Sequence, residues 1–204
     1  MTTARAVITG LLAIVVLEAA GAERQPSISQ IAATVTQLGS GWTSSRVVAL
    51  IDPLCSPSEM ADENEDPQGF LRLARSQLQK QPRREAYAIL RYYGGSTGRY
   101  HTNALVYIVR WKSKADIGND WGYDKETKDS PGALPKIGEE VRFSQRHGMH
   151  NNITFRRGSY LIDVEGPIVY GVEYLKRLAE VLDSNFLEAQ KTLGAGGEVP
   201  GAQK

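Results

Sequence analysis

The chain of 204 residues has few of the residue types that build stapled, metal-bound or strongly charged proteins. One cysteine excludes an internal disulfide and any Cys-x-x-Cys motif, and there are only three histidines. The 24 Lys and Arg nearly balance the 23 Asp and Glu, which gives a formal net charge of +1. Nucleic-acid binding and polybasic membrane attachment both need a large positive field, so this balance argues against them.

Long apolar runs are also lacking. The longest, residues 6–17, follows Arg5 and is too short for a membrane-spanning helix, which needs about 20 apolar residues. It precedes Ala20-Gly21-Ala22, an A-x-A cleavage pattern, so residues 1–22 are predicted to be a secretory signal peptide. An uncleaved N-terminal helix is the alternative. The sole cysteine, Cys55, is far from this segment, so we expect a secreted or periplasmic protein without a stable membrane anchor after cleavage.

The share of hydrophobic residues, 41%, is that of one globular domain able to bury a core. We predict an α+β domain over residues 23–193, with amphipathic helices packed on an antiparallel β-sheet, and a disordered tail over 194–204. Cys55 is expected to behave as a small buried hydrophobic residue, with a nucleophile or an intermolecular bridge as the alternatives.

The apolar spacing predicts where the elements lie. Ile28, Ile31, Val35 and Leu38 indicate one amphipathic helix, and residues 47–51 a short strand. Residues 56–68 are acidic and proline-punctuated, which indicates a solvated loop, and a second helix follows over about 70–78. Further on we expect a short helix over 113–121, a long loop over 122–135, a meander of strands at 140–145, 153–157 and 160–165, and a last helix over about 172–186.

The strongest local pattern is a hairpin of residues 85–93 and 100–111 around the glycine-rich turn 94–98. Period-2 counting leaves neither strand with a purely polar face, so both strands should lie centrally in the sheet. A helix layer is expected on one face of the sheet, and loops or a partly open aromatic surface on the other.

The order of these elements, with the segments 107–116, 134–140 and 154–164, resembles uncharacterised exported bacterial proteins and lipoproteins. Some of these are similar to the Mog1/PsbP-like α/β/α sandwich. The resemblance covers about residues 27–187 and consists of hydrophobic patterning and a few glycines. It implies an extracytoplasmic binding or accessory domain. It implies no catalytic residue, and this chain lacks the lipid-attachment cysteine common among such relatives.

Catalytic motifs are scarce as well. The sequence contains no G-x-S-x-G elbow, no H-E-x-x-H and no phosphate-binding loop. His147 and His150 have a spacing that two metal ligands could use, but a third ligand is needed. The alternative function is therefore an extracytoplasmic hydrolase or metal-dependent enzyme, for which the candidate groups are His101, His147 and His150 with Glu139, Glu140, Asp163 or Glu165. We predict no cofactor.

Aromatic residues of the hairpin are the best candidates for recognition, because aromatic rings stack on apolar or sugar rings and carry a polar edge. The predicted ligand-binding residues are Tyr87, Arg91, Tyr93, Tyr107 and Trp111. A core layer beneath a helix is the alternative role for these side chains. We therefore expect an exported, non-enzymatic binding or accessory domain of the cell envelope, whose partner is a small molecule or an envelope protein.

Overall fold

The computed structural model describes residues 24–62, 66–94, 103–122, 132–146 and 148–195. The predicted signal peptide, His101, His147 and most of the two predicted loops at 94–98 and 122–135 lie outside the described residues, as do residues 196–204. Residues Pro26–Ala189 form one compact unit.

The core element of the Pro26–Ala189 unit is a seven-stranded sheet with the order β2-β1-β3-β4-β7-β6-β5. The strands are β1 (Trp42–Ile51), β2 (Glu59–Ala61), β3 (Arg84–Gly94), β4 (Asn103–Trp111), β5 (Glu140–Arg146), β6 (His150–Arg157) and β7 (Tyr160–Pro167). Every pairing is antiparallel. The α+β prediction is confirmed, and the hairpin strands β3 and β4 are interior strands, as their apolar faces indicated.

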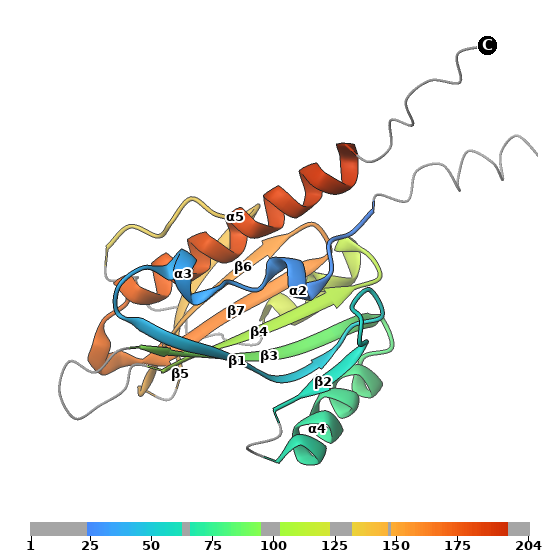
Figure 1. Cartoon of the computed structure of the whole chain (residues 1–204). Helices are drawn as coiled ribbons and strands as arrows, with labels where there is room; N and C mark the ends of the chain where they lie inside the picture. The colour runs from blue at the N-terminus through green and yellow to red at the C-terminus, as the bar shows by residue number, and fades with distance from the viewer. Residues whose placement is uncertain (1–23, 63–65, 95–102, 123–131, 147, 196–204) are drawn as a thin grey trace, which may run out of the picture. The chain divides into compact units, whose positions relative to one another are not determined.

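One face of the sheet packs against α5 (Glu173–Ala195) and the short helices α2 (Ile28–Ile31) and α3 (Val35–Leu38), as Figure 1 shows. The apolar stripe of α5 meets alternate residues of the central strands. The fully buried members of this core include Val106, Ile108, Ile153, Phe155, Ile162, Val164, Leu175, Leu178, Leu182 and Phe186. This core is formed by the period-3.6 and period-2 patterns read from the sequence.

The single N-terminal helix predicted over residues 28–38 is wrong, because the structure has two helices of one turn each. Ser27 with Gln30, and Thr34 with Gln37, form two successive capping boxes, and each box starts its own helix. Between them the backbone N–H of Ala33 donates to the Tyr92 hydroxyl at 3.0 Å, a bond that a continuous helix would not allow.

The second face carries α4 (Pro67–Lys80), which lies on the opposite side of the sheet from α5 (Figure 1). The Asp66 side chain caps α4 by accepting from the Gly69 N–H at 2.8 Å. Its buried Ala74 packs in a second apolar cluster with residues of β1 and β3. The expectation of loops or an open aromatic surface here is therefore wrong over β1 and β3. Sequence periodicity shows that a helix has an apolar stripe, but it does not show which face of the sheet that stripe packs against.

Other elements differ from prediction mainly at their ends. The predicted loop 56–68 contains the short edge strand β2, and β1 begins five residues before the predicted position 47, at Trp42. The short helix predicted at 113–121 is the 3₁₀-helix η1 (Lys114–Gly122), and a further 3₁₀ turn, η2 (Ile168–Tyr170), precedes α5. Gly194 and Ala195 are helical and do not belong to the predicted tail.

Gly138, just before β5, is held in a conformation that excludes a side chain. Its φ is +59°, and a Cβ there would lie 2.5 Å from the backbone oxygen of Arg156. Gly148 has a similar φ of +64° and open space around it. We expect Gly148→Ala to cost about 1–2 kcal/mol, the left-handed backbone penalty alone. Gly138→Ala should cost about 3 kcal/mol or more in urea unfolding, because it adds a backbone clash. Equal losses would contradict the tight packing at Gly138.

Candidate ligand-binding pocket

A pocket of about 420 Å³ lies where the C-terminal end of α4 passes over the second face of the sheet. The lining residues are Gln77, Lys80 and Gln81 at the end of α4, Arg84 and Tyr87 on β3, Tyr107 and Val109 on β4, and Asp163 on β7. The volume is within the range of small-molecule sites, about 300–1,000 Å³. The pocket lies where α4, which packs on β1 and β3, borders strands β4 and β7.

Two tyrosines and a valine form the apolar part of this pocket. Tyr87 pairs with Val109 and Ile89 pairs with Tyr107, so Tyr87 and Tyr107 are diagonal neighbours on one face. Tyr87 and Val109 are each only 8% exposed and belong to the apolar cluster beneath α4. Burial is the main cause that raises the pKa of Tyr87 to about 12, and the neighbouring Tyr107 adds to the increase. The Tyr87 hydroxyl is protonated at neutral pH, as a tyrosine ordinarily is, and can donate a hydrogen bond.

Cationic groups lie at the α4 end of the pocket. The Arg84 guanidinium stands over the Trp111 ring, 4.9 Å from its centroid, and its Nη1 donates to Gln77 Oε1 at 3.3 Å. Stacking on the indole keeps the guanidinium plane in a defined orientation. Lys80, in the last turn of α4, is exposed and makes no ion pair within the described part of the chain. The α4 side of the pocket therefore offers positive charge to a ligand.

An acidic group lies on the other side, on β7. Asp163 is paired in register with Tyr107 on β4 and with Thr154 on β6. Its Oδ1 accepts from Thr154 Oγ1 at 2.9 Å, and Asn152 Nδ2 lies 3.5 Å from both carboxylate oxygens. An ionised carboxylate only accepts hydrogen bonds, so Asp163 is an acceptor group in the pocket lining. The pocket thus combines an aromatic floor with positive charge at one side and an acceptor at the other.

The structure brings together two of the five predicted ligand-binding residues. Tyr87 and Tyr107 line the pocket. Trp111 is 2% exposed, which matches the alternative role of a core residue. Arg91 and Tyr93 lie further along β3 and do not line this pocket; Arg91 Nη1 is 3.5 Å from the Tyr93 hydroxyl. The hairpin alone therefore does not define the site, because the pocket forms only where the end of α4 borders this face of the sheet.

Of the three histidine candidates, His150 is described by the structure, and it does not line this pocket. His150 Nδ1 lies 3.3 Å from Glu165 Oε1, while His101 and His147 are outside the described residues. Glu139 pairs with Lys114 and Arg156, and Glu140 pairs with Arg142 and Arg156. Within the described ranges no group of three or more His, Cys, Asp or Glu side chains is placed to hold a metal ion.

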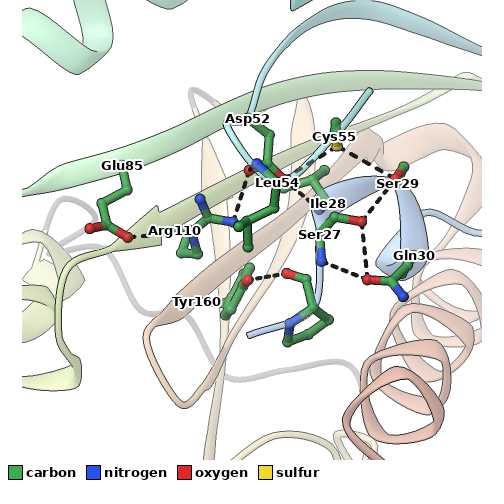
Figure 2. Close-up of polar contacts among 11 residues, drawn as sticks. Ser27, Ile28, Ser29, Gln30, Asp52, Leu54, Cys55, Glu85, Arg110 and Tyr160 are labelled. Carbon is green, nitrogen blue, oxygen red and sulfur yellow. Dashed lines mark hydrogen bonds and ion pairs between the residues drawn. The ribbon is translucent and has the colours of Figure 1, made fainter. Parts of the chain in front are cut away.

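A buried polar network at the other face of the sheet was not predicted from the sequence (Figure 2). Asp52, directly after β1, is fully buried, and its Oδ1 lies 2.9 Å from Arg110 Nη1 on β4. The Asp52 carboxylate also accepts from the backbone N–H groups of Ile28 at 2.7 Å and Leu54 at 3.0 Å. The Tyr160 hydroxyl on β7 donates to the Pro26 carbonyl oxygen. The network therefore fastens the segment before α2 onto the sheet.

Burial and charge set the ionisation of this network. Burial disfavours the charged form of Arg110, but the neighbouring Tyr160 and Asp52 outweigh it and raise the pKa of Arg110 above its ordinary value. Burial raises the pKa of Tyr160 to about 12. One sequence signal could have revealed the network: Arg110 lies between the apolar residues 106–109 and Trp111. An arginine buried in such a strand requires a charged partner. Cys55, predicted to be buried, is half-buried with its thiol 3.4 Å from Asp52 Oδ2.

Comparison with known proteins gives no relative: no family model, no curated protein and no solved structure matches the chain. Among the helices that the structure describes, none is long and apolar enough to cross a bilayer.

Proposed function

We propose that the protein is an exported binding domain that holds a small molecule in the pocket between α4 and strands β3, β4 and β7. The observation that carries the proposal is the pocket itself, of about 420 Å³, where Tyr87 and Tyr107 adjoin Lys80, Arg84 and Asp163. Sites of this kind use an apolar surface to gain affinity and a few placed polar groups to fix orientation. The apolar run and cleavage pattern of residues 1–22 support export to the periplasm or the exterior.

Two features make a holding role suitable for this pocket. Its floor is carried by central strands of the sheet, whose backbone is fixed on both sides by neighbouring strands. The polar groups come from the end of α4, from Arg84 at the start of β3 and from Asp163 on β7, so a ligand among them is contacted from several directions. A rigid floor of this sort lowers the ordering cost of binding.

The proposal is tested by screening a library of small soluble fragments by ligand-observed NMR against the purified full chain. Gln77→Trp is the test variant, because Gln77 lines the pocket from α4 and an indole there would fill the cavity. Leu73→Trp is the matched control, because Leu73 is on the same helix, is 43% exposed and does not line the pocket. We expect hits that Leu73→Trp retains and Gln77→Trp loses. Hits that both variants bind equally, or no hits at all, would refute the proposal.

A further inference from the structure

The charge and hydrogen-bonding pattern of the pocket identifies a class of ligand. Among the eight described residues that line it, five have charged or amide side chains: Gln77, Lys80, Gln81, Arg84 and Asp163. Such a lining matches a molecule with several polar groups and not a purely apolar one. Building on the function proposed above, we infer that the ligand is a sugar acid, meaning a sugar ring with several hydroxyl groups and one carboxylate.

Positive charge on the α4 side selects the carboxylate. In the described part of the lining, the two cations Lys80 and Arg84 outnumber the one acid, Asp163, so these residues are complementary to one negative charge. Lys80 is the residue available to bind it, since it has no ion-pair partner in the portion of the chain that is described. Arg83, the next cation along the chain, is instead paired with Asp116 at 2.9 Å. We therefore assign the ligand carboxylate to Lys80, with Arg84 adding to the positive potential.

Hydroxyl groups account for the remaining polar atoms. Asp163 accepts a hydrogen bond from Thr154, and a carboxylate of this kind is the acceptor that a sugar hydroxyl donates to. The amides of Gln77 and Gln81 each offer a donor and an acceptor, which matches a hydroxyl that donates and accepts at once. The Tyr87 hydroxyl, which also lines the pocket, supplies a further donor.

The tyrosines and the volume of the pocket fit a ring. A pyranose ring with equatorial substituents, such as that of D-glucuronate, presents axial C–H groups on its faces, and such a face can pack on an aromatic side chain such as Tyr107. The volume of about 420 Å³ is toward the lower end for small-molecule sites, so it suits a mono- or disaccharide acid.

The test is to titrate the full chain with D-glucuronate, D-glucuronamide and D-glucose, followed by isothermal titration calorimetry and by NMR. The three probes share the ring, and only the first carries the charge. We expect D-glucuronate to bind about tenfold more tightly than D-glucuronamide, the size of effect that a charge-assisted hydrogen bond gives. Lys80→Gln should abolish this preference, while Lys112→Gln, an exposed lysine outside the pocket lining, should keep it.

The outcomes separate this inference from the proposed function. Pocket-bound fragments that Gln77→Trp loses, combined with equal affinities for the acid and the amide, would overturn the sugar-acid inference and leave the binding function standing. An acid preference that survives in Lys80→Gln would overturn the assignment of Lys80. A lysine in the last turn of a helix also stabilises the helix through its interaction with the helix dipole. Lys80→Gln could therefore lower stability, so the free energy of unfolding is measured for each variant. A loss of acid preference at unchanged stability is the result that a purely structural lysine would not give.

Discussion

Replacing Arg110 by methionine is expected to destabilise the protein by about 3–5 kcal/mol, one of the two largest effects that the structure predicts. Arg110 and Asp52 are 2% and 0% exposed, so neither charge has access to bulk water. Removing the guanidinium leaves the Asp52 carboxylate buried without its counter-charge. The two backbone N–H groups that bond to Asp52 offset only part of this cost. Urea unfolding followed by circular dichroism measures the loss.

The matched control is Arg83→Met, which removes a surface ion pair of the same residue types. The Arg83 side chain is 73% exposed, and its Nη1 lies 2.9 Å from Asp116 Oδ1. Exposed pairs contribute about 0–1 kcal/mol, so this variant should change little. A double-mutant cycle with Asp52→Ala completes the test, since the double variant should lose less stability than the sum of the two single variants. Similar losses for Arg110→Met and Arg83→Met would show that the buried pair does not have the role assigned to it.

The second large effect is expected at Phe186, where α5 meets the sheet. Phe186 is 1% exposed, and its ring packs edge-on against Tyr160 with the centroids 5.1 Å apart. Phe186→Ala removes this contact and leaves a cavity, at a cost of about 3–5 kcal/mol in the free energy of unfolding. Because the sheet and α5 share one core, a single cooperative transition at a lower urea midpoint should be seen.

The control for this variant is the next residue on the same helix, Leu187→Ala. Leu187 is 37% exposed and is not part of the buried core. Truncating it should cost less than about 1 kcal/mol. A loss at Leu187 that equals the loss at Phe186 would mean that α5 faces the sheet with a different stripe.

Much of this fold was predictable because it depends on local patterns. The β3–β4 hairpin, the three-stranded meander and the stripe of α5 all follow from apolar periodicity in short windows. The N-terminal helix was wrong for a local reason too. Residues Ile28 to Leu38 keep helical spacing across a break, and the two capping boxes that cause the break at Thr34 were visible in the sequence.

Long-range pairing was not predictable. β2 is a three-residue strand whose existence depends on its pairing with β1, and nothing within Glu59–Ala61 alone indicates a strand. The same reason hid the Asp52–Arg110 pair, whose members are 58 residues apart and meet only through the order of the strands. Local patterns in a single sequence do not reveal this order.

The candidate site was predictable in part. The hairpin supplied Tyr87 and Tyr107 because aromatic residues on strands are visible in the sequence. The α4 residues Gln77, Lys80 and Gln81 were missed because their role depends on which sheet face α4 covers and where the helix ends. Arg91, Tyr93 and Trp111 were predicted to bind the ligand together with Tyr87 and Tyr107, because period 2 places them all on one face of the hairpin. The pocket occupies only part of that face, and these three residues do not line it.

The measurement that tests the binding function most directly is the set of intermolecular nuclear Overhauser effects between a bound small molecule and assigned side chains of the protein. Our account predicts contacts from the ligand to the ring protons of Tyr107 and Tyr87 and to the methyl groups of Val109, which together line the pocket. Ligand contacts confined to other surfaces, such as the exposed side chains of Met149 and Val169, would contradict it.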